Sequence, residues 1–171
     1  MRVQDLSSVL AVLNPVGLFE GDRPSDFDAA FEVAVGIAGV VLRKLCLREA
    51  ATLRARDEIR RADTGSALLV MEKFYPWQET VVPEMPHVLL VAFPSPDGSW
   101  KVQVVPPALG SFGERFPLPA AWKGLRDEDF AAATGVPDAV FCHPGGLIAG
   151  AKSKEGTLAL ARLALEAGGV S

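Results

Sequence analysis

A glycine-rich segment near the C-terminal end of the sequence has residue types suited to binding phosphate. In FCHPGGLIAGAKSKEGTLALARLAL, residues 141–165, the glycines Gly145, Gly146 and Gly150 let a ligand approach the backbone closely. Ser153 stands where the N-cap of a following helix is expected, and the free N–H groups of a helix N-terminus favour an anion. The spacing therefore predicts a loop and a helix start that together hold a phosphate group.

Three further side chains of this segment can donate hydrogen bonds to an anion. Lys152 and Lys154 add positive charge on either side of the predicted cap. His143 ends a predicted strand, and its imidazole can donate to a phosphate oxygen or to a base edge. The same residues are also typical of a tight hairpin at 144–146 followed by an ordinary helix cap. The local sequence leaves both interpretations open.

Arg115, Arg126 and Gln103 are the remaining polar candidates for contact with a ligand. A guanidinium matches the geometry of a phosphate, so either arginine can neutralise one, or can instead clamp the proline-rich segment in which it lies. Gln103 alternates with Val102 and Val104 on a predicted strand. Its amide faces a ligand or bonds to polar groups inside the fold, and the sequence does not decide between the two.

Motifs for self-contained catalysis are missing from the sequence. His87 and His143 are the only histidines, and the chain has no HxxxH pair, no carboxylate cluster at metal-ligand spacing, no GxxxxGK[ST] loop and no GxSxG turn. We therefore expect neither a metal site nor a cofactor in this chain, and we assign it no catalytic residue.

Three stretches of the second half carry a specific combination of motifs: SWKVQVVP at 99–106, SFGERFPLPAAWKGLRDEDF at 111–130 and HPGGLIAGAKSKEG at 143–156. Together they resemble the C-terminal half of the Myg-type family of the DHH phosphoesterase superfamily, a family often labelled metal-dependent protein hydrolase. EKFYPWQE at 72–79 and LSSVLAVLNP at 6–15 are similar to two further segments of that family. The resemblance covers nearly the whole chain.

The resemblance implies a division of labour between two domains. Members of the family carry an N-terminal domain whose histidines and aspartates, including the DHH triplet, bind catalytic divalent metals, and those motifs do not occur in this sequence. The resemblance therefore implies that this chain is the substrate-binding domain. It also implies that Mn²⁺ or Mg²⁺ is held by a DHH domain in cis or in trans. His143, Gly145, Gly146, Lys152 and Ser153 are then implied to hold the phosphate of a nucleotide or short single-stranded RNA.

Two other functions compete with this one. The first is a protein-interaction module without a catalytic role, which would form a homodimer through exposed apolar residues of a long helix such as Val40. The second is an independent hydrolase, for which the sequence gives no catalytic constellation. The sequence contains no protease site. It does not decide between RNA, DNA and a dinucleotide as the substrate.

Helices are expected in the first third of the chain. Leu6, Leu10 and Leu13 have helical spacing, and Asn14 followed by proline ends that short segment. Ser25 is the expected N-cap of a long helix that runs to about residue 59 and bends near Gly36 or Gly39. We expect residues 1–24 to be a linker-like segment with a short helix, and residues 25–171 to form a single α/β domain of the DHH-associated C-terminal type.

Strands are expected in the rest of the chain. Apolar runs or alternation predict them at 67–74, 87–93, 99–106, 139–143 and 146–151, with a closing helix over 154–167. The turn signal PSPDGS joins the second and third strands as an antiparallel hairpin. The simplest α/β architecture for these elements is one mixed β-sheet packed with helices. Residues 106–130 are expected to form only short helical pieces.

The composition of the chain indicates which compartment and which partners are expected. The 171 residues carry a formal net charge of −4, which argues against coating of nucleic acid through bulk charge, although residues 43–61 hold seven basic side chains against three acidic ones. A solvated helix face is the simpler interpretation of that basic stretch. Cys46 and Cys142 have apolar neighbours in the sequence, and both are predicted to be buried thiols. Without a signal region or membrane span, we expect a cytoplasmic protein that does not enter a membrane.

Overall fold

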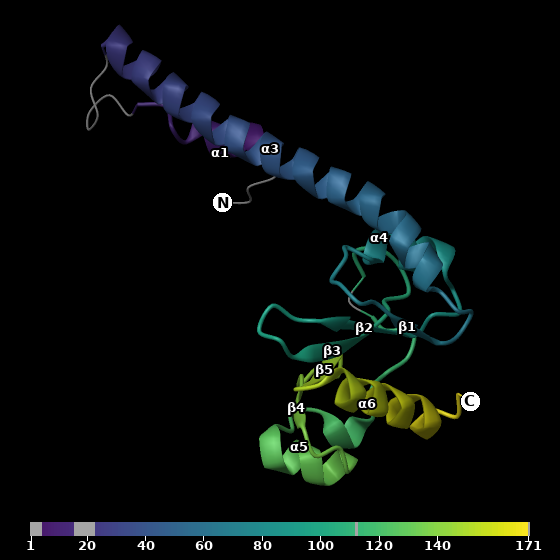
Figure 1. Ribbon diagram of the computed structural model, residues 1–171. Helices are drawn as coiled ribbons and strands as arrows, with labels where there is room; N and C mark the ends of the chain where they lie inside the picture. The colour runs from purple at the N-terminus through teal and green to yellow at the C-terminus, as the bar shows by residue number, and fades with distance from the viewer. Residues whose placement is uncertain (1–4, 16–22, 112, 171) are drawn as a thin grey trace. The chain divides into compact units, whose positions relative to one another are not determined.

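The computed structural model describes residues 5–15, 23–111 and 113–170. The chain divides into two compact units, residues 1–50 and 51–171, and the division falls inside a long helix. The predicted architecture of a mixed sheet with helices and a long helix near the N-terminus is confirmed (Figure 1).

The first unit contains two helices in its described residues. Asp5 caps helix α1, Leu6–Ala11, by accepting a hydrogen bond from the backbone N–H of Ser8 at 2.7 Å. Helix α3, Pro24–Ala62, begins one residue before the predicted cap, so the assignment of Ser25 as N-cap was wrong. Proline suits a first helical position because its missing N–H has no helical partner there. The carboxylate of Asp26 accepts instead from the backbone N–H of Arg23 at 3.1 Å.

Five strands form the sheet of the second unit, in the order β1-β2-β3-β5-β4 (Figure 1). Their bounds are Leu68–Val70 for β1, Leu90–Pro94 for β2, Trp100–Val104 for β3, Ala139–Cys142 for β4 and Ile148–Ala151 for β5. The pair β1 and β2 is parallel, and the other three pairs are antiparallel. The predicted hairpin of β2 and β3 is present, and β4 pairs with β5 in the same antiparallel way.

One face of the sheet packs on the two C-terminal helices. Helix α5, Asp127–Thr134, and helix α6, Lys154–Ala167, bury Phe130 and Leu160 completely against that face. Apolar side chains of β2, β3 and β5 meet them, among them the fully buried Val102. Burial of these side chains is the main stabilising contribution to this half of the unit.

The opposite face is covered near β1 and β2 by the last turns of α3 and by helix α4, Gln78–Glu84. Ile59 of α3 is fully buried there. Arg60 and Arg56 both donate to the carboxylate of Glu84, each through Nε at 2.9 Å. These hydrogen bonds lower the pKa of Glu84, and the bond from Arg60 has the larger effect. Part of the basic stretch therefore serves as a structural ion-pair network.

The two cysteines differ from each other in exposure. Cys142 is buried, and burial raises the pKa of its thiol while the positive charge of Lys123 opposes that shift. Cys46 is exposed on α3, so the prediction that both thiols are buried was wrong for this residue. Apolar neighbours in sequence do not bury a helical residue, because neighbours one position apart point in different directions.

The predicted strand at 67–74 is shorter than expected, since only Leu68–Val70 forms β1. The segment 106–130 contains the short 3-10 helix η1, Ala120–Trp122, and the start of α5, as the proline content predicts. Within the described residues, none of the helices combines the length and the apolar character needed to cross a bilayer.

Candidate functional site

A tight turn joins β4 to β5 and carries the central residues of the predicted site. The backbone N–H of His143 donates to the carbonyl of Ile148 at 2.9 Å, and that of Gly146 donates to the carbonyl of His143 at 2.7 Å. Gly146 has a φ of +71°, a left-handed conformation that favours glycine. The hairpin that the local sequence left as one interpretation is therefore present.

The imidazole of His143 is oriented by its own loop. The backbone N–H of Gly145 donates to its Nδ1 at 3.0 Å, and an N–H group can only donate. In this arrangement Nδ1 is the acceptor, so the neutral ring carries its proton on Nε2. The side chain is exposed, which leaves Nε2–H available as a hydrogen-bond donor to a ligand oxygen.

His143 and Arg126 line the same pocket, although they are 17 positions apart in the sequence. The pocket has a volume of about 260 Å³ and is lined by Gly124, Arg126, Phe141, Cys142, His143 and Pro144. Arg126 reaches it because its backbone forms an isolated bridge with Phe141 at the free edge of β4. A guanidinium and a ring N–H beside a glycine turn are suitable donors for a phosphate group.

The backbone is bent sharply where Arg126 enters this pocket. Asp127, the next residue, has a φ of +46°, which is uncommon for a residue with a side chain. Gly124 has a φ of +82°, and its N–H donates to the carbonyl of Cys142 at 3.1 Å. The segment 124–127 is thus attached along β4 by backbone contacts, which fixes the position of Arg126.

Lys123 was not predicted as a site residue, yet it lies directly over the glycine turn. A Cβ built on Gly146 would lie 2.5 Å from Cε and 3.2 Å from Nζ of Lys123. The lysine stands between Trp122, which is buried, and Gly124. The only sequence signal for it was its place inside the motif AWKGLRD, since nothing local relates residue 123 to the loop at 143–146.

Lys152 and Ser153 lie at the other end of β5 from His143 and the glycine turn. The four residues Ile148–Ala151 separate the two groups, and at about 3.3 Å per residue they span roughly 13 Å. One phosphate group cannot contact both ends of such a strand. The structure therefore brings His143, Gly145, Gly146 and Arg126 together and separates Lys152 and Ser153 from them.

The start of α6 already holds a carboxylate. Ser153 caps the helix by accepting from the N–H of Gly156 at 3.0 Å, and its own N–H and hydroxyl both donate to Oδ2 of Asp138, at 2.8 and 2.5 Å. A negative charge at a helix N-terminus is stabilised by the free N–H groups. Here Asp138 supplies that charge.

Lys154, the second lysine of the predicted phosphate site, is directed elsewhere. Its ammonium forms an ion pair with Glu72 and lies 5.3 Å from the centre of the Trp100 ring. Gly150 sits within the sheet, where a Cβ would lie 2.9 Å from the carbonyl oxygen of Trp100 and 3.0 Å from Cε1 of Phe141. These contacts give Gly150 a packing role between neighbouring strands.

Gln103 lines a different and smaller pocket. That pocket, of about 110 Å³, is also lined by Gln78, Val104, Pro106, Ser111, Gly113 and Leu147. Leu147 belongs to the same turn as His143, but the two side chains line separate pockets. A role of Gln103 in substrate binding stays a prediction.

Arg115 is engaged with backbone carbonyls at the end of α4. Its guanidinium donates to the carbonyls of Met85 and Val88, at 2.8 and 3.1 Å, and also to that of Val82. The last carbonyls of a helix have no partner within the helix, so this side chain satisfies them from outside. These contacts support the structural interpretation of Arg115, in which it fastens the proline-rich segment to the end of α4 and the residues that follow it.

Residues 5–15, 23–111 and 113–170 contain no group of three or more His, Cys, Asp or Glu side chains placed to hold a metal ion. The described part of the chain therefore does not fit the Mn²⁺ or Mg²⁺ that the resemblance implies for a DHH domain. The pocket at His143 offers hydrogen-bond donors and positive charge, which suit binding of an anion.

Comparison with known proteins identifies relatives of this chain. The family model MYG1_exonuc, whose description is Uncharacterised protein family (UPF0160), matches residues 1–165. A MYG1 protein of Saccharomyces cerevisiae is 36% identical over 124 residues, covering 68% of this chain and 36% of the yeast protein. The MYG1 exonuclease of Homo sapiens is 29% identical over 175 residues, covering 94% of this chain and 46% of the human protein. The chain thus spans less than half the length of these curated relatives.

Proposed function

Because the chain belongs to the MYG1 family (UPF0160), we propose that it is the substrate-binding part of an exonuclease-like hydrolase. In this proposal it holds the phosphate of a nucleotide or of a short single-stranded RNA. The observation that carries the proposal is the convergence of Arg126 and His143 on one pocket beside a glycine turn.

The donors of that pocket have complementary roles. Nε2–H of His143 is directed by the bond that Gly145 makes to Nδ1, so it can donate without reorganising the loop. The Arg126 guanidinium supplies charge and a planar pair of N–H donors. The two N–H groups of the glycine turn donate within the loop, that of Gly145 to Nδ1 of His143 and that of Gly146 to the His143 carbonyl, so the turn holds the imidazole in place. Together these groups bind and orient the substrate, and they perform no bond cleavage.

Hydrolysis in this proposal belongs to a separate metal-binding domain of the DHH type, present in cis or in trans. That domain would use Mn²⁺ or Mg²⁺, because divalent ions stabilise the charge that develops during phosphoryl transfer. This chain corresponds to the C-terminal, DHH-associated half of such an enzyme. Lys152, exposed at the far end of β5, would contact a second phosphate of a longer strand, whereas the N–H and hydroxyl of Ser153 already donate to Asp138.

Replacing His143 with alanine is expected to weaken RNA binding about tenfold, because one hydrogen bond to a charged oxygen contributes about 1.5 kcal/mol. The measurement is fluorescence anisotropy of a 5′-labelled single-stranded RNA at low and moderate salt. Binding should also weaken with salt, since phosphate contacts release counterions.

The matched control is His87→Ala, which removes the only other histidine. Nε2 of His87 lies 3.0 Å from Oδ1 of Asp63, so it is occupied by a structural contact. The affinity of this variant should equal that of the wild type. Absence of RNA binding by the wild-type chain, or equal losses in both variants, would contradict the proposed function.

A second candidate function, a protein-interaction or dimerisation module, is favoured by one specific observation. Large apolar side chains of α3 are exposed along two stripes with helical spacing. One stripe consists of Val33, Ile37, Val40 and Leu47, and the other of Phe27, Phe31, Val35, Leu42 and Leu45. Such a surface is typical of a helix that is covered by another polypeptide.

Sedimentation velocity at several concentrations tests this candidate. The chain should associate as its concentration rises, and Val40→Glu should shift it toward the monomer because a carboxylate is costly to bury. Ser25→Glu adds the same charge at an exposed polar position of α3 and should leave association unchanged. A wild-type chain that stays monomeric throughout would exclude the dimer.

A further inference from the structure

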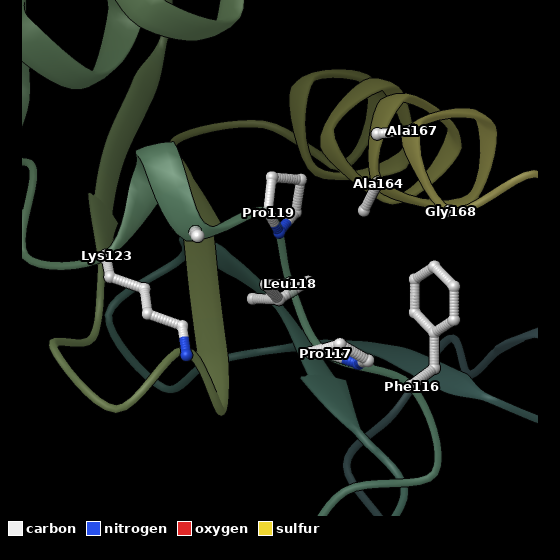
Figure 2. A pocket seen from close by; sticks show the side chains of 9 residues that line it. Phe116, Pro117, Leu118, Pro119, Lys123, Ala164, Ala167 and Gly168 are labelled. Atoms are coloured by element: carbon white, nitrogen blue, oxygen red, sulfur yellow. The ribbon is translucent and has the colours of Figure 1, made fainter.

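A large apolar pocket lies under the C-terminal end of α6. It has a volume of about 450 Å³ and is lined by Phe116, Pro117, Leu118, Pro119, Ala120, Lys123, Ala164, Ala167 and Gly168. Figure 2 shows Phe116 and Pro117 below Ala164 and Ala167 of the helix, with the ring of Pro119 beside Ala164. Its volume falls within the range of about 300–1,000 Å³ that is usual for small-molecule sites.

The walls of this pocket are fixed by close packing. A Cβ built on Gly168 would lie 2.2 Å from Cε2 of Phe116, so the phenyl ring rests against the end of α6 and cannot swing toward it. Leu118, another lining residue, is almost fully buried. The pocket is therefore preformed, which limits the conformational entropy that is lost when a ligand binds.

Lys123 connects this pocket with the glycine turn. Among the described residues that line the pocket, it alone has a charged side chain, and its Nζ would lie 3.2 Å from a Cβ built on Gly146. Among the described residues, the structure gives Lys123 no acidic partner. Its ammonium is thus a free positive charge at the border between an apolar pocket and the loop that carries His143.

We infer that Lys123 and this apolar pocket form a nucleotide subsite, in which Lys123 contacts a phosphate oxygen and the base packs among the rings of Phe116, Pro117 and Pro119. The inference deepens the proposed function and rests on it. A base fits because its faces are flat and apolar, and stacking on such side chains is favourable for every base. Apart from Lys123, the lining side chains have no polar atoms, so this subsite accepts all four bases.

Lys123→Ala should weaken binding of the labelled RNA about tenfold and reduce the slope of log affinity against log salt by about one counterion. Lys123→Arg should retain most of the affinity, because the charge is kept. The control is Lys73→Ala, an exposed lysine that follows β1 at the opposite edge of the sheet. It should change neither the affinity nor the slope.

Whether the base occupies the pocket is tested by a substitution that fills the pocket from an exposed position. Ala167→Trp places an indole in the opening without touching the buried core, and Glu166→Trp adds the same side chain next to the lining. An RNA that lacks its terminal base should bind the wild type more weakly than the intact RNA. Ala167→Trp should abolish this difference, and Glu166→Trp should preserve it.

The outcomes separate this inference from the proposed function. If the wild type does not bind RNA, the proposed function fails. If the wild type binds and His143→Ala weakens it, but Lys123→Ala and Ala167→Trp bind like the wild type, the proposed function stands and the subsite is overturned. If Lys123→Ala weakens binding but the abasic RNA binds as well as the intact one, the pocket does not hold the base.

Discussion

Replacing Gly156 with alanine is expected to lower the free energy of unfolding by about 3 kcal/mol, the upper end of the cost of overpacking. Alanine normally stabilises a helix relative to glycine by about 1 kcal/mol, so the sign is reversed here. The reason is Asp138, whose Oδ1 would lie 2.1 Å from the new Cβ. Either the carboxylate leaves the helix start, with loss of its bonds to Ser153, or α6 shifts within the core.

Urea denaturation of matched variants checks this expectation. Gly39→Ala makes the same substitution in helix α3, where nothing lies within 4 Å of the new Cβ, and it should not destabilise the chain. In an Asp138→Ala background the cost of Gly156→Ala should largely disappear. An equal cost in both backgrounds would show that Asp138 is not the cause.

Replacing Arg115 with alanine should also lower the free energy of unfolding by about 3 kcal/mol. The carbonyls of Val82, Met85 and Val88 lose their charged donor. That of Met85 still accepts from the N–H of Val88 at 3.1 Å, whereas each of the other two acceptors loses its partner at a cost of about 1 to 3 kcal/mol. Lysine cannot replace this residue, because a single ammonium does not reproduce the planar fork of the guanidinium. Thermal and urea unfolding measure the effect.

Arg126→Ala is the informative comparison for Arg115→Ala. Its side chain is exposed and lines the pocket at His143, so its removal should change stability little and weaken RNA binding. Arg115→Ala should do the reverse when RNA binding is measured under conditions where the variant is folded. If the stability of Arg115→Ala equals that of the wild type, the three carbonyl contacts are not important for folding.

The order of helices and strands was predictable because it depends on local patterns. Alternation along 99–106 and the turn signal at 94–99 predict the hairpin of β2 and β3, and the apolar run at 146–151 predicts β5. The position of Cys46 was not predictable in the same way. Its exposure depends on which side of α3 is covered, and that is a property of partners distant in the sequence.

The candidate site was predictable only in part. The predicted strand at 146–151 already implied a separation between His143 and Lys152, because an extended segment cannot bring its two ends to one phosphate. Asp138 at the start of α6 and Lys123 on the glycine turn could not be foreseen. Each meets a residue at least 15 positions away, through the pairing of β4 with β5 and through the backbone contacts of 124–127 with β4.

The two edge strands of the sheet have a consequence for the solubility of the chain. Strand β1 has only three residues, and β4 is interrupted by a register shift between Ala139 and Phe141 and is bridged by Arg126. Short or irregular edges give an incoming strand few regular N–H and C=O groups to pair with. Unwanted growth of the sheet from one copy to the next is thereby discouraged.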